Sequence, residues 1–293
     1  MSSGQAEALF DRLRVDESVL GVFLSGSRGK GFHTDTSDYD VYIVVADEGL
    51  EPARRRYPFR YSPIIDCIVT SLSAFRAYAE PGAPGAWDRY SFAHVEVLFG
   101  NAEAEIQRLV DRKGRLPPEL RNQTLRDALD AYLNAVYRAF KRLKQGDGLG
   151  AKLEAARSIP PLLSFLFGLY GRHAPFAGYL ERELDAYPLG ALPVSAAELL
   201  AGLEGTLQAD AGAMQTLLRH VDALGRDEGL ADVTEGWDEA YPWMLRFSAE
   251  ASAATPEGWP PHLRLVARPS HFCVYSPLAR CSPTGFEGGD FFV

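Results

Sequence analysis

The sequence predicts an α+β protein in which a small mixed-sheet domain precedes an α-helical bundle domain. In residues 1–105, short apolar runs alternate with glycine-rich or polar turns, a pattern typical of strands connected by short helices. Residues 106–250 carry apolar side chains at helical spacing over long stretches, which predicts a bundle. Residues 251–293 hold six prolines, from Pro256 to Pro283, and no helical periodicity, so we expect an irregular tail there.

In the first domain the expected elements alternate between helix and strand. We expect helices at 5–14 and 72–79, a turn with a short helix at 26–32, and strands at 19–24, 39–46, 64–70 and near 92–99. The run VLGVFL at 19–24 is apolar throughout, which is consistent with a buried strand. Ser71 precedes the helix at 72–79 and is a suitable N-cap.

The bundle is expected to contain three long helical stretches. They are residues 124–144, 151–170 and 195–224. Thr124 begins a capping-like signal before the first stretch, and Ser195 begins a capping box before the third. Gly225 should end the third stretch. The pair Pro160-Pro161 should interrupt or kink the second, because proline lacks an N–H and clashes with the preceding turn.

The charge is acidic overall and basic in one region. The formal net charge is −9, which argues against nucleic acid as a partner, because general nucleic-acid binding needs a basic face. Residues 106–157 nevertheless hold twelve Lys and Arg against six Asp and Glu, a balance of +6. A local basic surface suits a small polyanion such as a nucleoside triphosphate. The alternative interpretation is a solvated helix surface.

Hydropathy and cysteine content bear on location. No apolar run reaches the roughly 20 residues that a membrane span needs, so we expect no membrane partner. The N-terminal segment is polar and lacks a secretory apolar region. The three cysteines, Cys67, Cys273 and Cys281, are too few and too scattered for a disulfide framework or a zinc site. A cytoplasmic protein is therefore expected.

Two aspartates mark the start of the expected second strand. Asp38 and Asp40 flank Tyr39 in the run DYDVYIVV. Residues two apart on a strand project from the same face of the sheet, so the two carboxylates should lie side by side. Adjacent carboxylates repel each other, and a divalent cation relieves this repulsion. Oxygen ligands of this kind favour Mg²⁺, which proteins commonly hold with one or two carboxylates plus substrate phosphates.

A third aspartate lies on the next expected strand. Asp66 stands within IIDCIVT, among apolar neighbours that would make an unpartnered carboxylate unfavourable. If this strand pairs beside the second, about 4.8 Å away, Asp66 can join Asp38 and Asp40 on one face. Three carboxylates so placed could support two metal ions about 3.5–4 Å apart, which suits in-line displacement at phosphorus.

The first expected strand ends in Ser25-Gly26-Ser27, a turn suited to approaching an anion. Gly26 allows a sharp turn and a close backbone approach. Free N–H groups at the start of the following helix, the Ser27 hydroxyl and the Arg28 cation could all contact a phosphate. The spacing in GSRGKG matches neither a P-loop nor the dinucleotide-binding fingerprint.

The segment GSRGKGFHTDTSDYDVYIVV closely resembles the signature of the nucleotidyltransferase superfamily, which includes DNA polymerase beta and the aminoglycoside nucleotidyltransferases. That signature is a strand, a Gly-Ser turn, a polar loop, Asp-x-Asp on the next strand and a third carboxylate on a later one. The match covers residues 19–70, and the layout over about 1–250 is similar to that of the aminoglycoside-modifying enzymes.

The resemblance implies roles for seven residues. Asp38, Asp40 and Asp66 would be the catalytic metal ligands for Mg²⁺, with Asp66 holding the second ion, acting as general base, or both. The nucleotide contacts would come from Gly26, Ser27, Arg28 and Lys152. Lys152 is the first choice among the bundle lysines, with Lys141 and Lys144 as further candidates. The neighbouring Glu154 could contact the acceptor, although an ion pair within its own helix is the simpler expectation.

The expected function is transfer of a nucleoside monophosphate, AMP from ATP as the first expectation, to a hydroxyl of a small-molecule acceptor with release of pyrophosphate. An aminoglycoside-like compound is one candidate acceptor. Two alternatives stay open: the same chemistry on a protein or RNA acceptor, and a non-catalytic nucleotide-binding or antitoxin-type protein. The sequence leaves the acceptor, the base preference and the oligomeric state, including a homodimer, undetermined.

Overall fold

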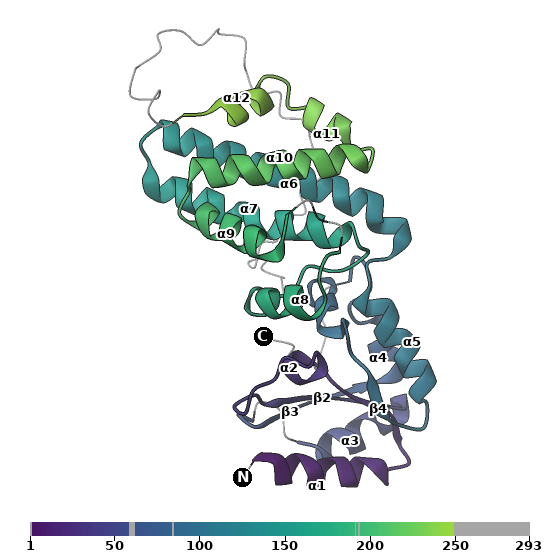
Figure 1. Cartoon of the computed structure of the whole chain (residues 1–293). Helices are drawn as coiled ribbons and strands as arrows, with labels where there is room; N and C mark the ends of the chain where they lie inside the picture. The colour runs from purple at the N-terminus through teal and green to yellow at the C-terminus, as the bar shows by residue number, and fades with distance from the viewer. Residues whose placement is uncertain (1, 59–61, 84, 191, 193, 249–293) are drawn as a thin grey trace, which may run out of the picture. The chain divides into compact units, whose positions relative to one another are not determined.

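The computed structural model describes residues 2–58, 62–83, 85–190, 192 and 194–248. Its first part is built on a mixed sheet, and its second part is helical, so the predicted α+β class is confirmed (Figure 1). The strands are β1 (Val19–Leu24), β2 (Tyr39–Val45), β3 (Ile65–Ser71) and β4 (Val97–Phe99). The helices around them are α1 (Ser2–Arg14), α2 (Gly26–Gly29), α3 (Leu50–Arg56), α4 (Leu72–Ala77) and α5 (Glu103–Gly114), with the 3-10 helices η1 (Asp47–Gly49) and η2 (Ala86–Phe92).

The sheet has the strand order β3-β2-β1-β4 over the described residues. Strand β1 pairs antiparallel with both β2 and β4. Strands β2 and β3 pair in parallel, which requires a crossover, and η1 and α3 supply it. Because the parallel pair is in continuous register from Tyr39 opposite Ile65 to Val45 opposite Ser71, residues at equivalent positions of the two strands share a face.

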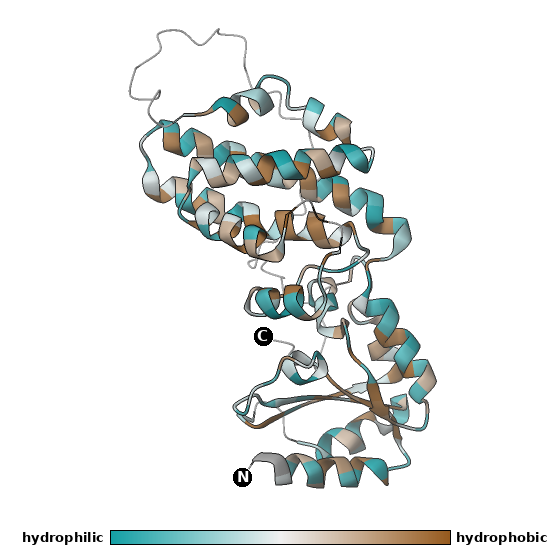
Figure 2. Cartoon of the chain, viewed as in Figure 1, coloured by the Kyte–Doolittle hydropathy of each residue, from teal (hydrophilic) through white to brown (hydrophobic). Residues whose placement is uncertain are grey.

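Helices cover both faces of the sheet, and each face has its own core. On one face, Val41 and Ile43 pack with Leu9 of α1 and Ala53 of α3. On the other, Tyr42 and Val44 of β2 pack with side chains from α4, η2 and α5, such as Phe75, Phe92 and Ile106. In Figure 2 strand β4 is coloured as hydrophobic, and α5 carries hydrophobic and hydrophilic residues in alternation. Strand β2 is thus buried on both sides except at its first residues.

The expected strand near 92–99 is wrong in its first half. Residues 86–92 form the 3-10 helix η2, and the strand is limited to Val97–Phe99. The main-chain oxygens of Tyr90, Ser91 and Ala93 accept hydrogen bonds from the Lys30 ammonium, so they are withdrawn from strand pairing. His94 has a φ of 61°, which also breaks an extended chain. Helix α3 was not predicted.

The second part is a set of helices around one core. These are α6 (Pro118–Lys144), α7 (Gly148–Gly168), η3 (Ala177–Tyr179), α8 (Leu180–Ala186), α9 (Ala196–Leu207), α10 (Ala211–Asp227), α11 (Ala231–Glu235) and α12 (Ala240–Arg246). The long pair α6 and α7 forms the centre, with buried Leu129, Phe140, Leu162 and Phe165 in one cluster with Leu218 of α10. The predicted helical bundle is therefore present.

Two predicted features of α6 and α7 are wrong. Helix α6 begins at Pro118, so Thr124 lies inside it and caps nothing; proline is well suited to the first helical position. Helix α7 continues past Pro160 and Pro161, so the predicted interruption is wrong, and the predicted kink stays a prediction. Both flanks of the proline pair are buried in the bundle core, where Ala155 and Leu162 are fully covered, and this packing outweighs the lost hydrogen bonds.

The third predicted helical stretch is two helices. The capping box at Ser195 is present and opens α9. The chain then turns at Ala209, whose φ is 57°, and Asp210 caps α10 by accepting from the Ala213 N–H at 2.7 Å. Gly225 does not end a helix but lies within α10, against Leu129. Apolar spacing continues across the break, which is why the sequence concealed it.

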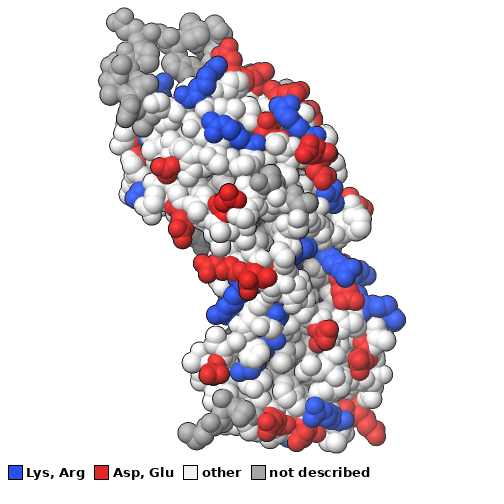
Figure 3. Space-filling view, in the orientation of Figure 1, with Lys and Arg blue, Asp and Glu red and all other residues white. Residues whose placement is uncertain are grey.

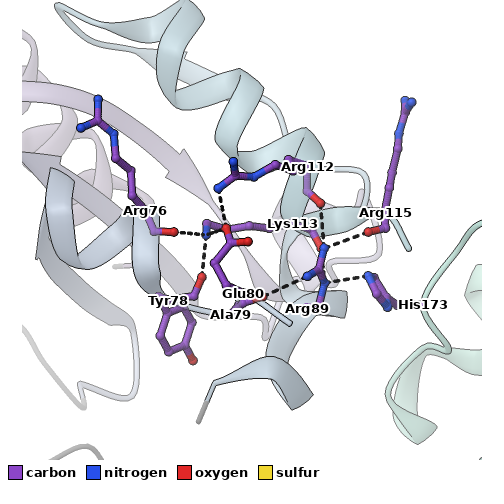
Figure 4. A network of polar contacts seen from close by, with 9 residues as sticks. All are labelled: Arg76, Tyr78, Ala79, Glu80, Arg89, Arg112, Lys113, Arg115 and His173. Atoms are coloured by element: carbon purple, nitrogen blue, oxygen red, sulfur yellow. Dashed lines mark hydrogen bonds and ion pairs between the residues drawn. The ribbon is translucent and has the colours of Figure 1, made fainter. Parts of the chain in front are cut away.

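A buried arginine joins η2 to the end of α5 and to the helical part (Figure 4). The Arg89 guanidinium donates to the main-chain oxygens of Lys113 and Arg115 at 3.1 and 3.0 Å, near the C-terminus of α5, where helix carbonyls lack internal partners. Its Nε also donates to Nε2 of His173 at 3.0 Å. This one side chain thus caps a helix and contacts the segment that follows α7.

Lys113 caps the C-terminal end of α4 in a similar way (Figure 4). It is fully buried, and its ammonium donates to the main-chain oxygens of Arg76 and Tyr78 and to the Glu80 carboxylate at 3.1 Å. Burial, partly offset by Glu80, lowers the pKa of Lys113. The network therefore has a structural explanation: it satisfies the ends of two short helices.

None of the helices in the described part of the chain is both long enough and apolar enough to cross a bilayer. Helix α5 packs on the sheet, where Ile106 and Val110 are fully buried. The division into domains at 1–105, 106–250 and 251–293 stays a prediction, and the predicted tail lies outside the described residues together with Cys273 and Cys281.

Candidate functional site

Asp40 and Asp66 are direct partners across the parallel strands β2 and β3. Alternation along β2 places Asp40 on the same face as Tyr42 and Val44, the face that α4 and η2 cover. Both aspartates are half-buried, at the end of the sheet where β2 begins. The register therefore brings together two carboxylates that are 26 positions apart in the sequence.

Asp38 lies one residue before β2 and is exposed. The charge of Asp38 and the charge of Asp66 both act on Asp40. Burial, and then the negative charges of Asp38 and Asp66, raise the pKa of Asp40 to about 6. In the absence of a cation, the arrangement therefore disfavours the ionised form of Asp40.

The Gly-Ser turn lies directly against Asp40. Gly26 has a φ of 56°, in the left-handed region, and a β-carbon there would lie only 1.9 Å from Oδ2 of Asp40. The main chains are also joined, since the Ser25 N–H donates to the Asp40 oxygen at 2.9 Å. A glycine is needed both for the backbone conformation and for the close approach to the carboxylate.

Helix α2 is short, as the sequence indicated. It is a single turn of four residues, Gly26–Gly29, and it lacks the aligned dipoles of a longer helix. The Ser27 main-chain oxygen accepts from the Phe32 N–H at 2.7 Å, which closes the following loop. Any anion contact here would come from the turn itself and from the Ser27 hydroxyl.

The basic residues near this turn are engaged with the main chain. Arg28 donates from Nε to the Asp38 oxygen at 2.8 Å and from Nη2 to the Ser37 oxygen at 2.7 Å. Lys30 is only 2 % exposed and donates to three carbonyls of the segment 90–93. Burial lowers the pKa of Lys30 to about 8, against the opposing charges of Glu183 and Asp88.

Lys152 lies on α7, and its ammonium contacts the Gln208 side chain at 3.2 Å, at the turn between α9 and α10. Its phosphate contact stays a prediction. Glu154 pairs with Arg157 of the same helix at 3.4 Å, as the simpler expectation had it.

The segment η3–α8 reaches the carboxylates, and the sequence did not reveal it. Arg182 donates to the Phe32 oxygen at 2.5 Å, next to the Gly-Ser turn. Tyr179 packs on the Phe32 ring, with centroids 6.0 Å apart. Burial, and then the charges of Asp40 and Asp38, raise the pKa of Tyr179, so both carboxylates act on its hydroxyl. The contact spans 150 positions in the sequence, so no local pattern could have indicated it.

The same segment is anchored by a buried carboxylate. Glu183 is 1 % exposed and accepts from the Tyr90 hydroxyl at 2.7 Å. It also bonds Nε2 of His94 at 2.8 Å and pairs with Arg172. These partners, His94 first among them, lower the net free-energy penalty of burying the charge. Tyr90 is therefore a buried residue that supports Glu183.

Several cations of the locally basic region 106–157 pair with acids that lie elsewhere in the chain. Arg112 pairs with Glu80, and Arg126 pairs with Asp232. Figure 3 shows the two signs interspersed over the visible face. This observation favours the alternative interpretation of that region as a solvated helix surface.

Across the residues that the structure describes, no three His, Cys, Asp or Glu side chains form a group that could hold a metal ion by themselves. Mg²⁺ often takes only one or two protein carboxylates and completes its shell with phosphate oxygens and water. The all-oxygen donor set and the raised pKa of Asp40 suit an ion that arrives together with a triphosphate. The metal-ligand assignment of Asp38, Asp40 and Asp66 stays a prediction.

Comparison with solved structures finds a crystal structure described as a nucleotidyltransferase-like protein from Exiguobacterium sibiricum 255-15. The two chains share 11% sequence identity with a TM-score of 0.34, over 74% of this chain and 76% of that one. No protein-family model matches the sequence, and no curated protein is significantly similar to it. The functional argument therefore depends on the residues of this chain.

Proposed function

We propose that this protein is a Mg²⁺-dependent nucleotidyltransferase that moves a nucleoside monophosphate from a nucleoside triphosphate to a hydroxyl group. The observation that carries the proposal is the pairing of Asp40 with Asp66 across β2 and β3, with Gly26 in contact with Asp40. This places a carboxylate group and a backbone turn that can approach a phosphate at the same end of the sheet.

The carboxylates would act through a cation brought by the nucleotide. Asp38 and Asp40 would hold it, and Asp66 would lie beside the acceptor. Bound Mg²⁺ would neutralise triphosphate oxygens and make the α-phosphorus more susceptible to attack. Asp66 would take the proton of the acceptor hydroxyl while the oxygen of that hydroxyl forms a bond to the α-phosphorus. The bond from the α-phosphorus to the oxygen that bridges it to the β-phosphorus would then break, and pyrophosphate would leave with that oxygen.

The acceptor is proposed to be a small molecule, with ATP as the first donor to test. Nucleic acid is the less favoured acceptor because the chain carries a net charge of −9. A protein acceptor is the second candidate within the same chemistry. An acceptor screen with α-labelled ATP would identify which class receives the labelled phosphate.

The direct test is nucleotide binding with and without metal. We expect each effective nucleoside triphosphate to raise the melting temperature in the presence of Mg²⁺ and to have little effect in excess EDTA. Asp40→Asn should remove the Mg²⁺-dependent rise in melting temperature. Asp35→Asn, which changes an exposed aspartate in the preceding loop, should keep that rise. If no triphosphate stabilises the unmodified protein under either condition, the proposal is wrong.

A non-catalytic nucleotide-binding protein is the other class to separate. It would show Mg²⁺-dependent stabilisation, but it would release no pyrophosphate with any acceptor. An enzyme should release pyrophosphate in proportion to the modified acceptor, and Asp66→Asn should stop this release while leaving much of the nucleotide binding.

A further inference from the structure

Arg28 forms hydrogen bonds with the segment that leads into β2, the strand that carries Asp40. Its Nε donates to the Asp38 main-chain oxygen at 2.8 Å, and Nη2 donates to that of Ser37 at 2.7 Å. The guanidinium carbon also lies 3.8 Å from the centre of the Tyr39 ring. Three successive residues are thus contacted by one planar group, immediately after Ser27 in the sequence.

Asp38 has little other support from the sheet. Strand β2 begins at Tyr39, whose N–H donates to the Ile64 oxygen at 2.9 Å, so Asp38 lies outside the ladder. The loop before it is closed by local bonds, such as that from the Ser37 N–H to the Thr34 oxygen at 3.1 Å. The Asp38 side chain is exposed, and its direction depends on how its main chain is held.

We propose that Arg28 is a positioning residue, which fixes the main chain at Ser37 and Asp38 so that the Asp38 carboxylate faces Asp40, and that it is not the phosphate ligand suggested by the sequence. The inference rests on the proposed function for its consequence in metal binding. Its structural basis does not, because both hydrogen bonds join groups of this chain itself.

The geometry makes arginine specific for this task. The two accepting carbonyls belong to adjacent residues, and the rigid fork reaches both while its face lies on Tyr39. Lysine carries the same charge, but its ammonium is a point donor on a flexible stem and cannot reproduce two fixed bonds together with the stacking. A phosphate ligand, in contrast, would retain much of its effect as lysine, because charge dominates that interaction.

The experiment compares Arg28→Lys and Arg28→Gln with Arg55→Lys and Arg55→Gln as matched controls on the exposed side of α3. Hydrogen–deuterium exchange on the nucleotide-free protein reports the loop directly. We expect amides of residues 34–39 to exchange about 10-fold faster in both Arg28 variants and at the unmodified rate in both Arg55 variants. Unchanged exchange in Arg28→Lys and Arg28→Gln would overturn the inference, whether or not the protein binds nucleotide.

The second measurement is Mn²⁺ affinity, by electron paramagnetic resonance of free Mn²⁺, with a non-hydrolysable ATP analogue. Loss of a group that orients a metal ligand commonly weakens metal affinity about 10- to 100-fold. Both Arg28 variants should fall in that range, and both Arg55 variants should keep the Mn²⁺ affinity of the unmodified protein. Normal Mn²⁺ affinity in Arg28→Lys, with weaker analogue binding only in Arg28→Gln, would show a phosphate ligand instead. If the unmodified protein binds neither probe, the proposed function fails and the exchange result alone decides the role of Arg28.

Discussion

Gly26 and Asp40 are in such close contact that a β-carbon on the glycine would lie 1.9 Å from the Oδ2 atom of the aspartate. The turn after β1 and the carboxylate at the start of β2 are therefore coupled, because a larger residue at position 26 would displace the Asp40 side chain. Gly31 provides a natural comparison, since its φ is 74° but no atom lies within 4 Å of its would-be β-carbon.

Gly26→Ala should be more damaging than Gly31→Ala. Both substitutions place alanine at a positive φ, which destabilises by about 1 kcal/mol. Only Gly26→Ala adds a steric conflict with Asp40, so its loss in free energy of unfolding should reach about 2–4 kcal/mol. Urea denaturation of the two variants checks this. Equal losses would mean that the contact with Asp40 relaxes at little cost.

Asp40→Asn should stabilise the metal-free protein while removing the metal-dependent nucleotide effect. The raised pKa of Asp40 means that the folded state binds more protons than the unfolded state between pH 3.8 and about 6, so stability falls as pH rises through that range. At pH 7.5 this penalty is fully present. It amounts to about 1–2 kcal/mol once solvent screening is allowed for, and asparagine removes it.

Thermal melting in EDTA at pH 7.5 measures that gain, and melting at pH 4 should show a smaller one. Asp35→Asn is the control, because Asp35 is exposed in the loop before β2. A lower melting temperature for Asp40→Asn in EDTA would contradict the repulsion between the carboxylates.

Stability should decrease in mild acid because of His173. Burial, and then the charge of Arg89, lower the pKa of His173 to about 4 from an ordinary value of 6.5. The unfolded state therefore binds more protons between those values, and stability is lost as pH falls from 6.5 toward 4. The neutral ring accepts a bond from the Arg89 guanidinium at 3.0 Å, which a protonated ring cannot do.

His173→Gln should reduce this acid sensitivity by about 2 kcal/mol over the interval, because glutamine retains an acceptor and does not titrate. Urea midpoints measured at pH 7, 5.5 and 4.5 give the slope. His33→Gln, at an exposed loop position, should keep the slope of the unmodified protein. If the urea midpoint of His173→Gln depended on pH as steeply as that of the unmodified chain, His173 would be excluded as the titrating group.

Tyr90→Phe should destabilise the protein, and Tyr132→Phe should not. The Tyr90 hydroxyl bonds the buried Glu183 carboxylate at 2.7 Å, and a hydrogen bond to a charged group contributes about 1.5–3 kcal/mol. The buried Tyr132 hydroxyl has no hydrogen-bond partner within the described part of the chain, so its removal should be neutral or stabilising. Chemical denaturation compares the two, and similar losses would indicate that volume alone matters.

The strand that carries Asp40 was predictable because its pattern is local. A period of two fixes which side chains of YDVYIVV share a face. The runs that form the neighbouring strands, VLGVFL and IIDCIVT, are too apolar to be surface loops. The parallel register that sets Asp40 opposite Asp66 then follows once β2 and β3 are neighbours. The N-caps at Ser71 and Ser195 were found for the same reason, since a cap depends on three or four adjacent residues.

Features that depend on distant contacts were not predictable. Arg182 meets Phe32 only because α8 folds back toward the turn after β1. Helix α7 passes through Pro160 because core packing overrides a local preference. The break at Ala209 leaves the apolar spacing intact, so the periodicity predicted one continuous helix where the structure has α9 and α10.

The Lys30 amine has a consequence for covalent labelling. An amine with a pKa of about 8 would ordinarily be among the first in a protein to react with an acylating reagent. Here each of its hydrogens faces a carbonyl, at 2.9, 3.2 and 2.8 Å, and the side chain is 2 % exposed. Reagent can reach it only when the segment 90–93 separates from it. The extent of acylation at Lys30 therefore reports how often this part of the native fold opens.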